Sequence, residues 1–423
     1  MINELLLFIF TCMIVLDMSW ILLFLLPARK HGDVDVYPNI SIILPAHNEG
    51  LSIGDSIKNA LAADYPGGRE VIVVNDGSQD RTGEIARAAA ATNHQLKAID
   101  VTHSGKAQAI NFGVAQASGE VVVVLDADSN LEKNALIEIV KPFSDERIGA
   151  VSGIIRAEMN LNPLTWFQDL EYMMSSTWRS VCNKINGTYL MPGFTAFRKK
   201  TLEAIGGFEK DTLCEDFDIG VRIKKAGYMM TMSSATMYTH VPQRIPALVR
   251  QRLRWSRGTL QVVKKHSDVP FNMKYGAMGL YGIPTQMYWF LHGFISLPLT
   301  IYQLGFGYFT YFAAYHDYFS MNVISYFFNW FSFYGMVDYS IKTFTGVYPM
   351  NLVFIFCFAS FTLGTLYTFL AIFRHTRIDV RHLLAVFFFF PYSFFALAVF
   401  MTPLLYELNP LTWGEKGRNI WTK

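Results

Sequence analysis

Two aspartates follow a run of valines, in a position that suggests chemistry. The stretch VVVVLDADSN covers residues 121–130 and carries carboxylates at Asp126 and Asp128. Four β-branched residues followed by a leucine are typical of a strand buried on both faces. On an extended chain the two aspartates point to the same side, where they repel each other unless a cation lies between them. The pattern therefore predicts a cation site at the end of a buried strand.

Polar side chains also follow the other predicted strands. Strands are predicted at ISIILPA, at EVIVV and over 96–101, with helices near 51–63 and 81–92 between them. This alternation predicts a parallel sheet with helices on both faces. Ligands of such sheets bind at the carboxyl ends of the strands. The polar residues at those ends are Asn48, Glu49, Asn75, Asp76, Asp80, Lys106, Asp126 and Asp128.

The predicted site favours a nucleotide diphosphate over a dinucleotide. The first strand ends in PAHNEG rather than in G-x-G-x-x-G, so a nicotinamide cofactor is not expected. Two aspartates with a lysine suit a nucleotide whose diphosphate is held by a divalent metal. Hard oxygen ligands favour Mg²⁺ or Mn²⁺ as that metal. His47 and His103 are interpreted as polar loop residues.

Both ends of the chain are apolar. With 52% hydrophobic and 15% aromatic residues, the chain is too apolar for a wholly soluble protein. Residues 5–26 are long enough to span a bilayer and are interrupted only by Asp17, which is either functional or faces a neighbouring helix. They lack the features of a cleavable signal, so an uncleaved anchor is expected. Arg29 and Lys30 then place the following domain in the cytoplasm.

The later apolar runs leave the membrane topology open. They lie near 278–304, 318–337, 351–373 and 383–405 and predict three or four crossings. Four crossings make the C-terminal tail cytoplasmic but put Arg374, Arg377 and Arg381 outside, against the positive-inside rule. If the run 318–337 only lies in the interface, those arginines move inside and the tail moves out, unless the run broken by Pro391 re-enters the membrane. We favour a cytoplasmic tail.

Cysteine spacing and charge exclude several other classes. The four cysteines, at positions 12, 182, 214 and 357, show no paired spacing, so neither a disulfide framework nor a zinc site is indicated. The net charge is +2 and no long basic run is present, so nucleic acid is not an expected partner.

Six segments in order resemble a known family. They are ILPAHNE, VIVVNDGSQDRT, GKAQAIN, VVVLDADS, LCEDFDIGVRI and QRLRW, and they span roughly residues 40–258. The set resembles the membrane-embedded family-two glycosyltransferases, the group that contains hyaluronan, chitin, cellulose and poly-N-acetylglucosamine synthases. The resemblance implies an α/β domain of GT-A fold inserted between transmembrane helices.

The resemblance also implies roles on the donor side. Asp76 would contact the uracil of a UDP-sugar, and Asp128 would bind the metal on the diphosphate, with Asp126 close to the nucleotide-sugar. Asp216 would be the general base. The donor-binding residues expected on these grounds are Asn48, Glu49, Asp76, Lys106 and Asp126.

On the acceptor side, the resemblance points to the QRLRW segment. Gln251, Arg254 and Trp255 would close over the diphosphate and the acceptor sugar. The segment YLMPGFTAFRK resembles the family's acceptor-side loop, in which Gly193 would allow close approach of a sugar. Residues 166–180 have a helical spacing of aromatic and methionine side chains, for which core packing is a commoner explanation than acceptor contact.

The chemistry of sugar transfer suits this set. Inverting transfer needs a carboxylate that takes the proton of the acceptor hydroxyl while the diphosphate leaves from the opposite face. Asp128 and Asp216 are far apart in the sequence, as separate roles require. A metal and a cation such as Arg254 would stabilise the leaving group, each well-placed donor contributing about 3–4 kcal/mol. Trp255 offers a flat apolar face to a pyranose ring.

Simpler interpretations stay open for three features. Asp128 or Ser129 could cap a helix over 131–141. Asp216 could be an acidic residue that favours the first turn of a helix. The third feature is a basic amphipathic helix that could lie on anionic lipid and still present Trp255; its arginines are Arg250, Arg252, Arg254 and Arg257.

The chain departs from the family's pattern in three places. Cys214 stands where the acid motif usually opens with Thr or Ser, so a thiol replaces a hydroxyl. His240 stands in THVP, where many relatives carry an acid. The ending TWGEKGR matches the family's W-x-x-T-x-R only loosely, and this partial match is the basis for a gating role of Trp413 and Arg418.

The sequence therefore predicts a plasma-membrane synthase with its catalytic domain in the cytoplasm. It would transfer a sugar, favoured as N-acetylglucosamine, from its UDP-sugar to a growing β-linked polysaccharide and export the polymer through the bilayer, with or without accessory export subunits. The alternatives are a single-addition transferase acting on a polyprenyl-phosphate acceptor and a non-catalytic export or sensing subunit. The predicted divisions are an anchor (1–30), a GT-A domain (31–243), interface helices (244–275), a transmembrane bundle (276–405) and a tail (406–423).

Overall fold

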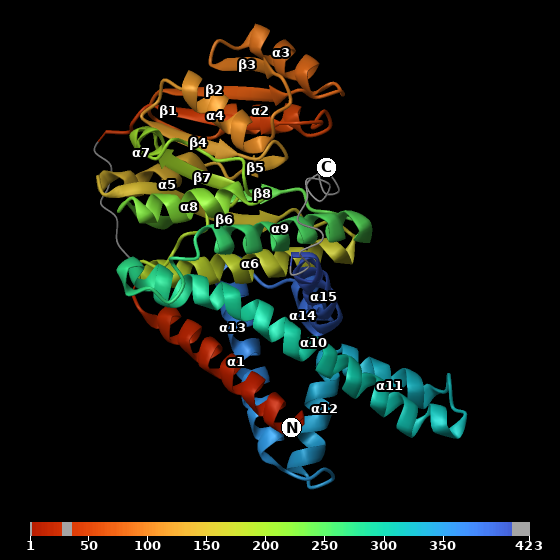
Figure 1. The fold of residues 1–423 in the computed structure, drawn as a ribbon. Helices are drawn as coiled ribbons and strands as arrows, with labels where there is room; N and C mark the ends of the chain where they lie inside the picture. The colour runs from red at the N-terminus through yellow and green to blue at the C-terminus, as the bar shows by residue number, and fades with distance from the viewer. Residues whose placement is uncertain (1, 28–35, 408–423) are drawn as a thin grey trace.

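The computed structural model describes residues 2–27 and 36–407. Arg29, Lys30, Trp413 and Arg418 lie outside these described residues. A mixed sheet forms the centre of one domain, in the order β3-β2-β1-β4-β7-β6-β8-β5 (Figure 1). Its strands are β1 (Ile40–Ala46), β2 (Arg69–Asp76), β3 (Leu96–Val101), β4 (Val121–Leu125), β5 (Ser129–Leu131), β6 (Ile148–Ala157), β7 (Phe194–Arg198) and β8 (Met229–Thr239).

Fifteen α-helices flank the sheet or extend away from it within the described residues. They are α1 (Ile2–Leu25), α2 (Ile53–Ala62), α3 (Thr82–Thr92), α4 (Lys106–Gln116), α5 (Ala135–Val140), α6 (Pro163–Lys184), α7 (Lys199–Ala204), α8 (Glu215–Lys225), α9 (Ile245–Lys265), α10 (Ile283–Tyr311), α11 (Met321–Phe331), α12 (Phe333–Phe344), α13 (Leu352–His375), α14 (Val380–Phe387) and α15 (Phe389–Glu407).

The expected parallel sheet is present in one half only. Strands β3, β2, β1 and β4 are parallel, and helices α2, α3 and α4 connect them as the alternation predicted. Strand β7 is antiparallel to both β4 and β6. The parallel arrangement predicted for the strands up to the valine run is therefore confirmed, whereas β7, which was not predicted, enters the sheet from a distant part of the chain and runs antiparallel.

The valine run is buried on both faces, as its composition predicted. Strand β4 lies between β1 and β7 in the sheet. Val121 and Val123 pack into the core on one face, whereas Val122 and Val124 pack into the core on the other. Side chains alternate across a strand, so an unbroken apolar run is what a strand covered on both faces requires.

The chain after the valine run differs from the prediction. Residues 127 and 128 form a turn, and the helix expected over 131–141 is replaced by β5 and the short α5. The N-cap position of α5 is Asn134, so helix capping by Asp128 or Ser129 is wrong. The physical reason is tertiary: Ser129 pairs with Thr239 in an antiparallel ladder between β5 and β8. The turn also means that Asp126 and Asp128 do not sit on one extended chain.

Long apolar helices leave the sheet domain on one side (Figure 1). Helices α1 and α13 are long and apolar enough to cross a membrane, and α14 with α15 would make a third span if this pair, bent by 62°, counts as one. The predicted run 318–337 is divided at Ser332 into α11 and α12, of 11 and 12 residues, each too short to cross alone. The total number of crossings stays a prediction. Helices α6 and α9 lie between the sheet and these apolar helices.

Candidate active site

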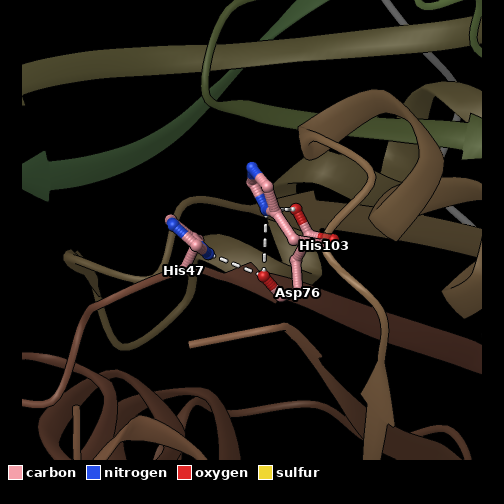
Figure 2. A group of neighbouring side chains, drawn as sticks. All are labelled: His47, Asp76 and His103. Atoms are coloured by element: carbon pink, nitrogen blue, oxygen red, sulfur yellow. Dashed lines mark hydrogen bonds and ion pairs between the residues drawn. The ribbon is translucent and has the colours of Figure 1, made fainter. Parts of the chain in front are cut away.

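Asp76, at the end of β2, is buried and lies beside the side chains of His47 and His103 (Figure 2). Its carboxylate accepts the backbone N–H groups of Ser104 at 2.7 Å and Gly105 at 2.9 Å. Nδ1 of His103 lies 2.9 Å from Oδ2, and Nδ1 of His47 lies 2.6 Å from the Asp76 carbonyl oxygen. Three loops, which follow the neighbouring strands β1, β2 and β3, are thus joined around one residue, Asp76, through its carboxylate and its backbone carbonyl.

The two imidazoles at Asp76 form a hydrogen-bonded cluster. Their rings stack with centroids 4.2 Å apart. Ligand atoms of His47, Asp76 and His103 lie within 4.8 Å of one another, close enough for a metal. Each Nδ1 faces an oxygen acceptor and therefore carries a proton, which leaves no lone pair on that atom for a metal. The prediction that both histidines are only polar loop residues missed these contacts; the signal was that both follow strands adjacent to β2.

Asn48 and Glu49 hold the loop after β1 in place. Asn48 has a left-handed backbone, with φ of 58°, and its Oδ1 accepts the backbone N–H of Gln79 at 2.9 Å. Glu49 accepts the hydroxyl of Ser52 at 3.1 Å. Their side chains order the loops beside Asp76. Direct contact with a donor stays a prediction for both residues.

Lys106 connects the cluster at Asp76 to the other acidic residues. It follows Gly105 at the start of α4, and its Nζ lies 2.5 Å from Asp126 and 3.4 Å from Glu215. Burial alone would lower the pKa of Lys106, but the carboxylates of Asp126 and Glu215 outweigh that effect and raise it. The ammonium group therefore stays charged. Glu215 was missed from the sequence, although it stands directly before Asp216.

Gly193 provides space beside Asp126. Its φ is +45°, and a Cβ at this position would lie 3.0 Å from Oδ2 of Asp126. The carbonyl oxygen of Gly193 accepts the backbone N–H of Asp126 at 3.3 Å. A side chain at this position would therefore crowd Asp126, and the expected close approach of a sugar to Gly193 stays a prediction.

Asp216 lies in the first turn of α8 and lines a small cavity with Lys106 and Gly193. Burial and the adjacent Glu215 raise its pKa to about 6, against the opposing effect of Lys106 and Arg254. A carboxyl group with such a pKa can accept a proton near neutral pH. Asp216 is also an acidic residue in the first turn of a helix, as the simpler interpretation expected. This position is compatible with a role as a base.

Asp128 lies in the turn that follows β4, beside β8. Its Oδ1 accepts the hydroxyl of Thr239 at 3.2 Å, and its backbone carbonyl lies 3.3 Å from Nδ1 of His240. The other ring nitrogen of His240 pairs with Glu158 at 3.1 Å. A partly exposed carboxylate with further oxygen donors nearby fits a hard divalent cation. Asp128 as the metal ligand stays a prediction.

A second acidic group already contains a cation of the protein. Glu209, Asp211 and Asp218 are close enough to hold a metal. The Nζ of Lys265 lies 2.6–2.8 Å from all three carboxylates. This ammonium group offsets part of the negative charge of the cluster and joins α8 to α9, so its role is structural.

Helix α9 places the QRLRW segment beside the first turn of α8, which carries Asp216. Burial and Glu215 raise the pKa of Asp216, and the positive charge of Arg254 acts against them, as expected of a cation close to a carboxylate. Cys214 donates its thiol to the carbonyl oxygen of Trp255 at 3.6 Å, so the departure from Thr or Ser forms a contact between α8 and α9. Arg252 is buried and paired with Glu171 at 2.6 Å. The interpretation that this arginine lies on lipid is therefore wrong.

The structure thus brings most of the predicted residues into one continuous arrangement. It runs from Asp76 through Gly105 and Lys106 to Asp126 and Asp216, at the carboxyl ends of β2 and β4 and the start of α8. Gln251 makes a different contact, accepting from Arg252 at 2.6 Å. Its predicted role at a diphosphate stays untested.

The site and sheet define a class of protein. Residues 41–206, which include most strands of the sheet, match the model of Glycosyl transferase family 2. The mannosyltransferase PcManGT from Pyrobaculum calidifontis, solved in complex with GDP-Man and Mn²⁺, matches with a TM-score of 0.58 at 21% identity, covering 89% of this chain and 99% of that chain. The predicted GT-A fold and the predicted class, a glycosyltransferase, are confirmed for this domain.

Particular relatives share this part of the chain. The poly-beta-1,6-N-acetyl-D-glucosamine synthase of Staphylococcus epidermidis is 31% identical over 249 residues, which cover 56% of this chain and 58% of that protein. The probable glycosyltransferase YdaM of Bacillus subtilis (strain 168) is 34% identical over 252 residues, covering 56% and 59%. The similarity therefore spans less than two thirds of the length of these relatives.

Proposed function

We propose that this chain transfers a sugar from a UDP-sugar to a growing polysaccharide, with inversion, and that Asp216 is the general base. The observation that carries the proposal is the position of Asp216 in a small cavity beside Glu215, Lys106 and Arg254. Burial and Glu215 raise the pKa of its carboxyl group to about 6, against the opposing effect of the two cations. The names of the similar synthases favour N-acetylglucosamine as the sugar and a polysaccharide as the product.

On the donor side, the proposed roles follow from the arrangement of charges. Asp76, held by two backbone N–H groups, would contact the base of the nucleotide. Lys106 would face the sugar diphosphate together with Asp126. Asp128 would hold Mg²⁺ or Mn²⁺, and such a cation neutralises charge on the departing diphosphate when it is bound. The mannosyltransferase of similar fold was solved with Mn²⁺, which supports a divalent cation.

We further propose that the transfer is processive and takes place at the plasma membrane. Gln251, Arg254 and Trp255 would bind the acceptor end, next to the apolar helices that would guide the polymer across the bilayer. Helices α1 and α13 support membrane anchoring by their length and composition. The catalytic domain would be cytoplasmic, where UDP-sugars are available, and accessory export subunits would be optional partners.

A second candidate is the addition of a single sugar to a lipid-linked acceptor. It is favoured by the name of the structure of similar fold, a mannosyltransferase, because that name specifies the transfer of a sugar and no polymer. The two candidates differ in product, because a processive enzyme makes a polymer and a single-addition enzyme makes one glycolipid.

The test is nucleotide release by the full chain in detergent, with Mg²⁺ or Mn²⁺ and a panel of UDP-sugars plus GDP-mannose. We expect UDP release with UDP-N-acetylglucosamine and a high-mass product that a glycosidase degrades. Release with only a short lipid-linked product would support the second candidate. No release with any donor, with and without added lipid acceptor, would contradict both and favour a non-catalytic export role.

A further inference from the structure

The ion pair of Arg252 and Glu171 packs against the ring of Trp255. The guanidinium of Arg252, one turn earlier on α9, lies 4.2 Å from the centre of the Trp255 ring. Arg252 is only 3% exposed, and its Nη2 donates to Glu171 on α6 at 2.6 Å. A buried cation above an indole ring is strongly attracted to it, and the pairing with Glu171 fixes where that cation lies.

A residue of the apolar helices completes the arrangement. The hydroxyl of Tyr392, on α15, donates to the same oxygen of Glu171 at 2.6 Å and lies 3.4 Å from Nη2 of Arg252. The Tyr392 ring stacks on Phe167 of α6 at 5.1 Å. Ser256 also donates its hydroxyl to the carbonyl oxygen of Phe400 on α15. Three elements therefore meet at one carboxylate.

The contact between Tyr392 and Glu171 links Trp255 to the bent α14–α15 pair. It lies in the first turn of α15, next to the 62° bend between α14 and α15. A shift of this bent pair would move the hydroxyl that contacts Glu171, and Glu171 holds the guanidinium on which the indole rests. Trp255 is half-buried, and Tyr172 of α6 flanks it at 6.3 Å.

We propose that Glu171, Arg252 and Tyr392 form a positioning triad that fixes Trp255 at the acceptor end of the site and couples its position to the bent α14–α15 pair. This inference rests on the proposed function, because it assigns Trp255 to the acceptor. None of the three residues touches a reacting group. Their effect is the orientation of the indole face that receives the acceptor sugar.

The triad predicts a selective kinetic defect. Glu171→Gln keeps the shape of the side chain but removes the charge that holds Arg252. We expect the KM for a soluble N-acetylglucosamine oligosaccharide acceptor to rise about 10- to 100-fold and the product to shorten, because a misplaced binding group can cost that much. The affinity for UDP, measured on the same preparation, is expected to stay within about twofold, since Asp76 and Lys106 are untouched.

Two further variants separate positioning from general damage. Tyr392→Phe removes one hydroxyl and is expected to give the same defect in weaker form. The double variant Glu171→Gln/Tyr392→Phe is expected to be no worse than Glu171→Gln alone, because both side chains act through one guanidinium. Asp145→Asn is the matched control: Asp145 is exposed to a similar degree, 30% against 32% for Glu171, and pairs with Arg147 at 2.7 Å, remote from the QRLRW segment in the sequence.

The outcomes distinguish failure of the proposed function from failure of the triad. If the wild-type chain releases no UDP, the proposed function fails. If the wild-type chain does release UDP, two results would overturn the triad. In the first, Glu171→Gln changes the acceptor KM and the UDP affinity by the same factor. In the second, Glu171→Gln has the same acceptor KM and UDP affinity as the control Asp145→Asn. A normal acceptor KM in Tyr392→Phe would overturn the coupling to α15, and a double variant whose defect is the sum of two separate defects would overturn the action through one guanidinium.

Discussion

At the residue scale, Asp216 is set apart by its neighbours rather than by its own chemistry. Burial and Glu215 favour its neutral form, whereas Lys106 and Arg254 favour the ionised form. The balance raises the pKa to about 6, so the native protein holds this proton more tightly than an unfolded chain would. The contribution of Asp216 to stability therefore falls as the pH rises from about 4 to 6. The same balance leaves the carboxylate ionised and able to accept a proton above pH 6.

The first prediction concerns pH. Because the base must be ionised before it can accept a proton, kcat/KM for UDP release is expected to fall about tenfold per pH unit below about pH 6. A pH profile from 4.5 to 8 measures it, with the circular dichroism of the domain recorded at each pH to confirm folding. A flat profile across pH 5 to 6 in a folded protein would argue against Asp216 as the base.

The second prediction concerns Gly193. Gly193→Ala places a Cβ 3.0 Å from Asp126 and requires φ of +45° from alanine, so it is expected to destabilise the protein by about 1–2 kcal/mol and to reduce turnover as well. Gly227→Ala is the control, since Gly227 has φ of +88° and open space around its Cβ. Thermal unfolding and UDP release together measure both. Equal loss of turnover in the two variants would remove the special role of Gly193.

At the scale of elements, the sequence predicted what is local. Strand β3 matches the expected 96–101, and the valine run is buried as expected, because β-branched runs mark buried strands. Strand β7 and the pairing of β5 with β8 were missed, since both depend on contacts between segments far apart in the chain. The same limit applies to the site. Asp76 and Asp216 stand out in their motifs, whereas the partners Glu171 and Tyr392 share no local signal with QRLRW.

The third prediction tests the junction of α8 and α9. Burial raises the pKa of Asp218, but His266 at 2.9 Å and Lys265 at 2.8 Å outweigh burial and lower it. Its stabilising effect is therefore present above the unfolded pKa near 3.9 and lost as the pH falls through the lower native value. Asp218→Asn is expected to lower the free energy of unfolding by about 3–5 kcal/mol at pH 7. Thermal unfolding at pH 7 and at pH 3 measures it; an equal deficit at both values would contradict the assignment.

At the scale of the whole molecule, polar contacts hold the sheet domain against the apolar helices. Arg156 pairs with Asp169 at 2.7 Å within the domain and donates to the carbonyl oxygen of His375, at the end of α13, at 3.1 Å. Lys184 of α6 donates to the carbonyl oxygen of Phe24, at the end of α1, at 2.7 Å. These contacts fix the domain at one end of α1 and α13. The opposite ends of both helices must then lie across the bilayer if the helices span it.

The fourth prediction follows from that geometry. Residue 346, in the loop between α12 and α13, is expected on the side of the membrane opposite to residue 147 in the sheet domain. In intact cells, an impermeant maleimide is expected to label Gly346→Cys but not Arg147→Cys, with the parent chain as the background control. Labelling of both from the same side would contradict a membrane-spanning α13.

The role of Asp216 as the base is tested most sharply by comparing turnover and binding in Asp216→Asn. The substitution keeps the shape of the side chain and removes its ability to accept a proton. UDP release from UDP-N-acetylglucosamine is expected to fall at least 1000-fold, because the proton of the acceptor hydroxyl has no acceptor. Binding of UDP, measured calorimetrically with Mn²⁺, is expected to persist, since Asp76 and Lys106 are unchanged. Turnover retained at the wild-type rate would show that Asp216 is not the base.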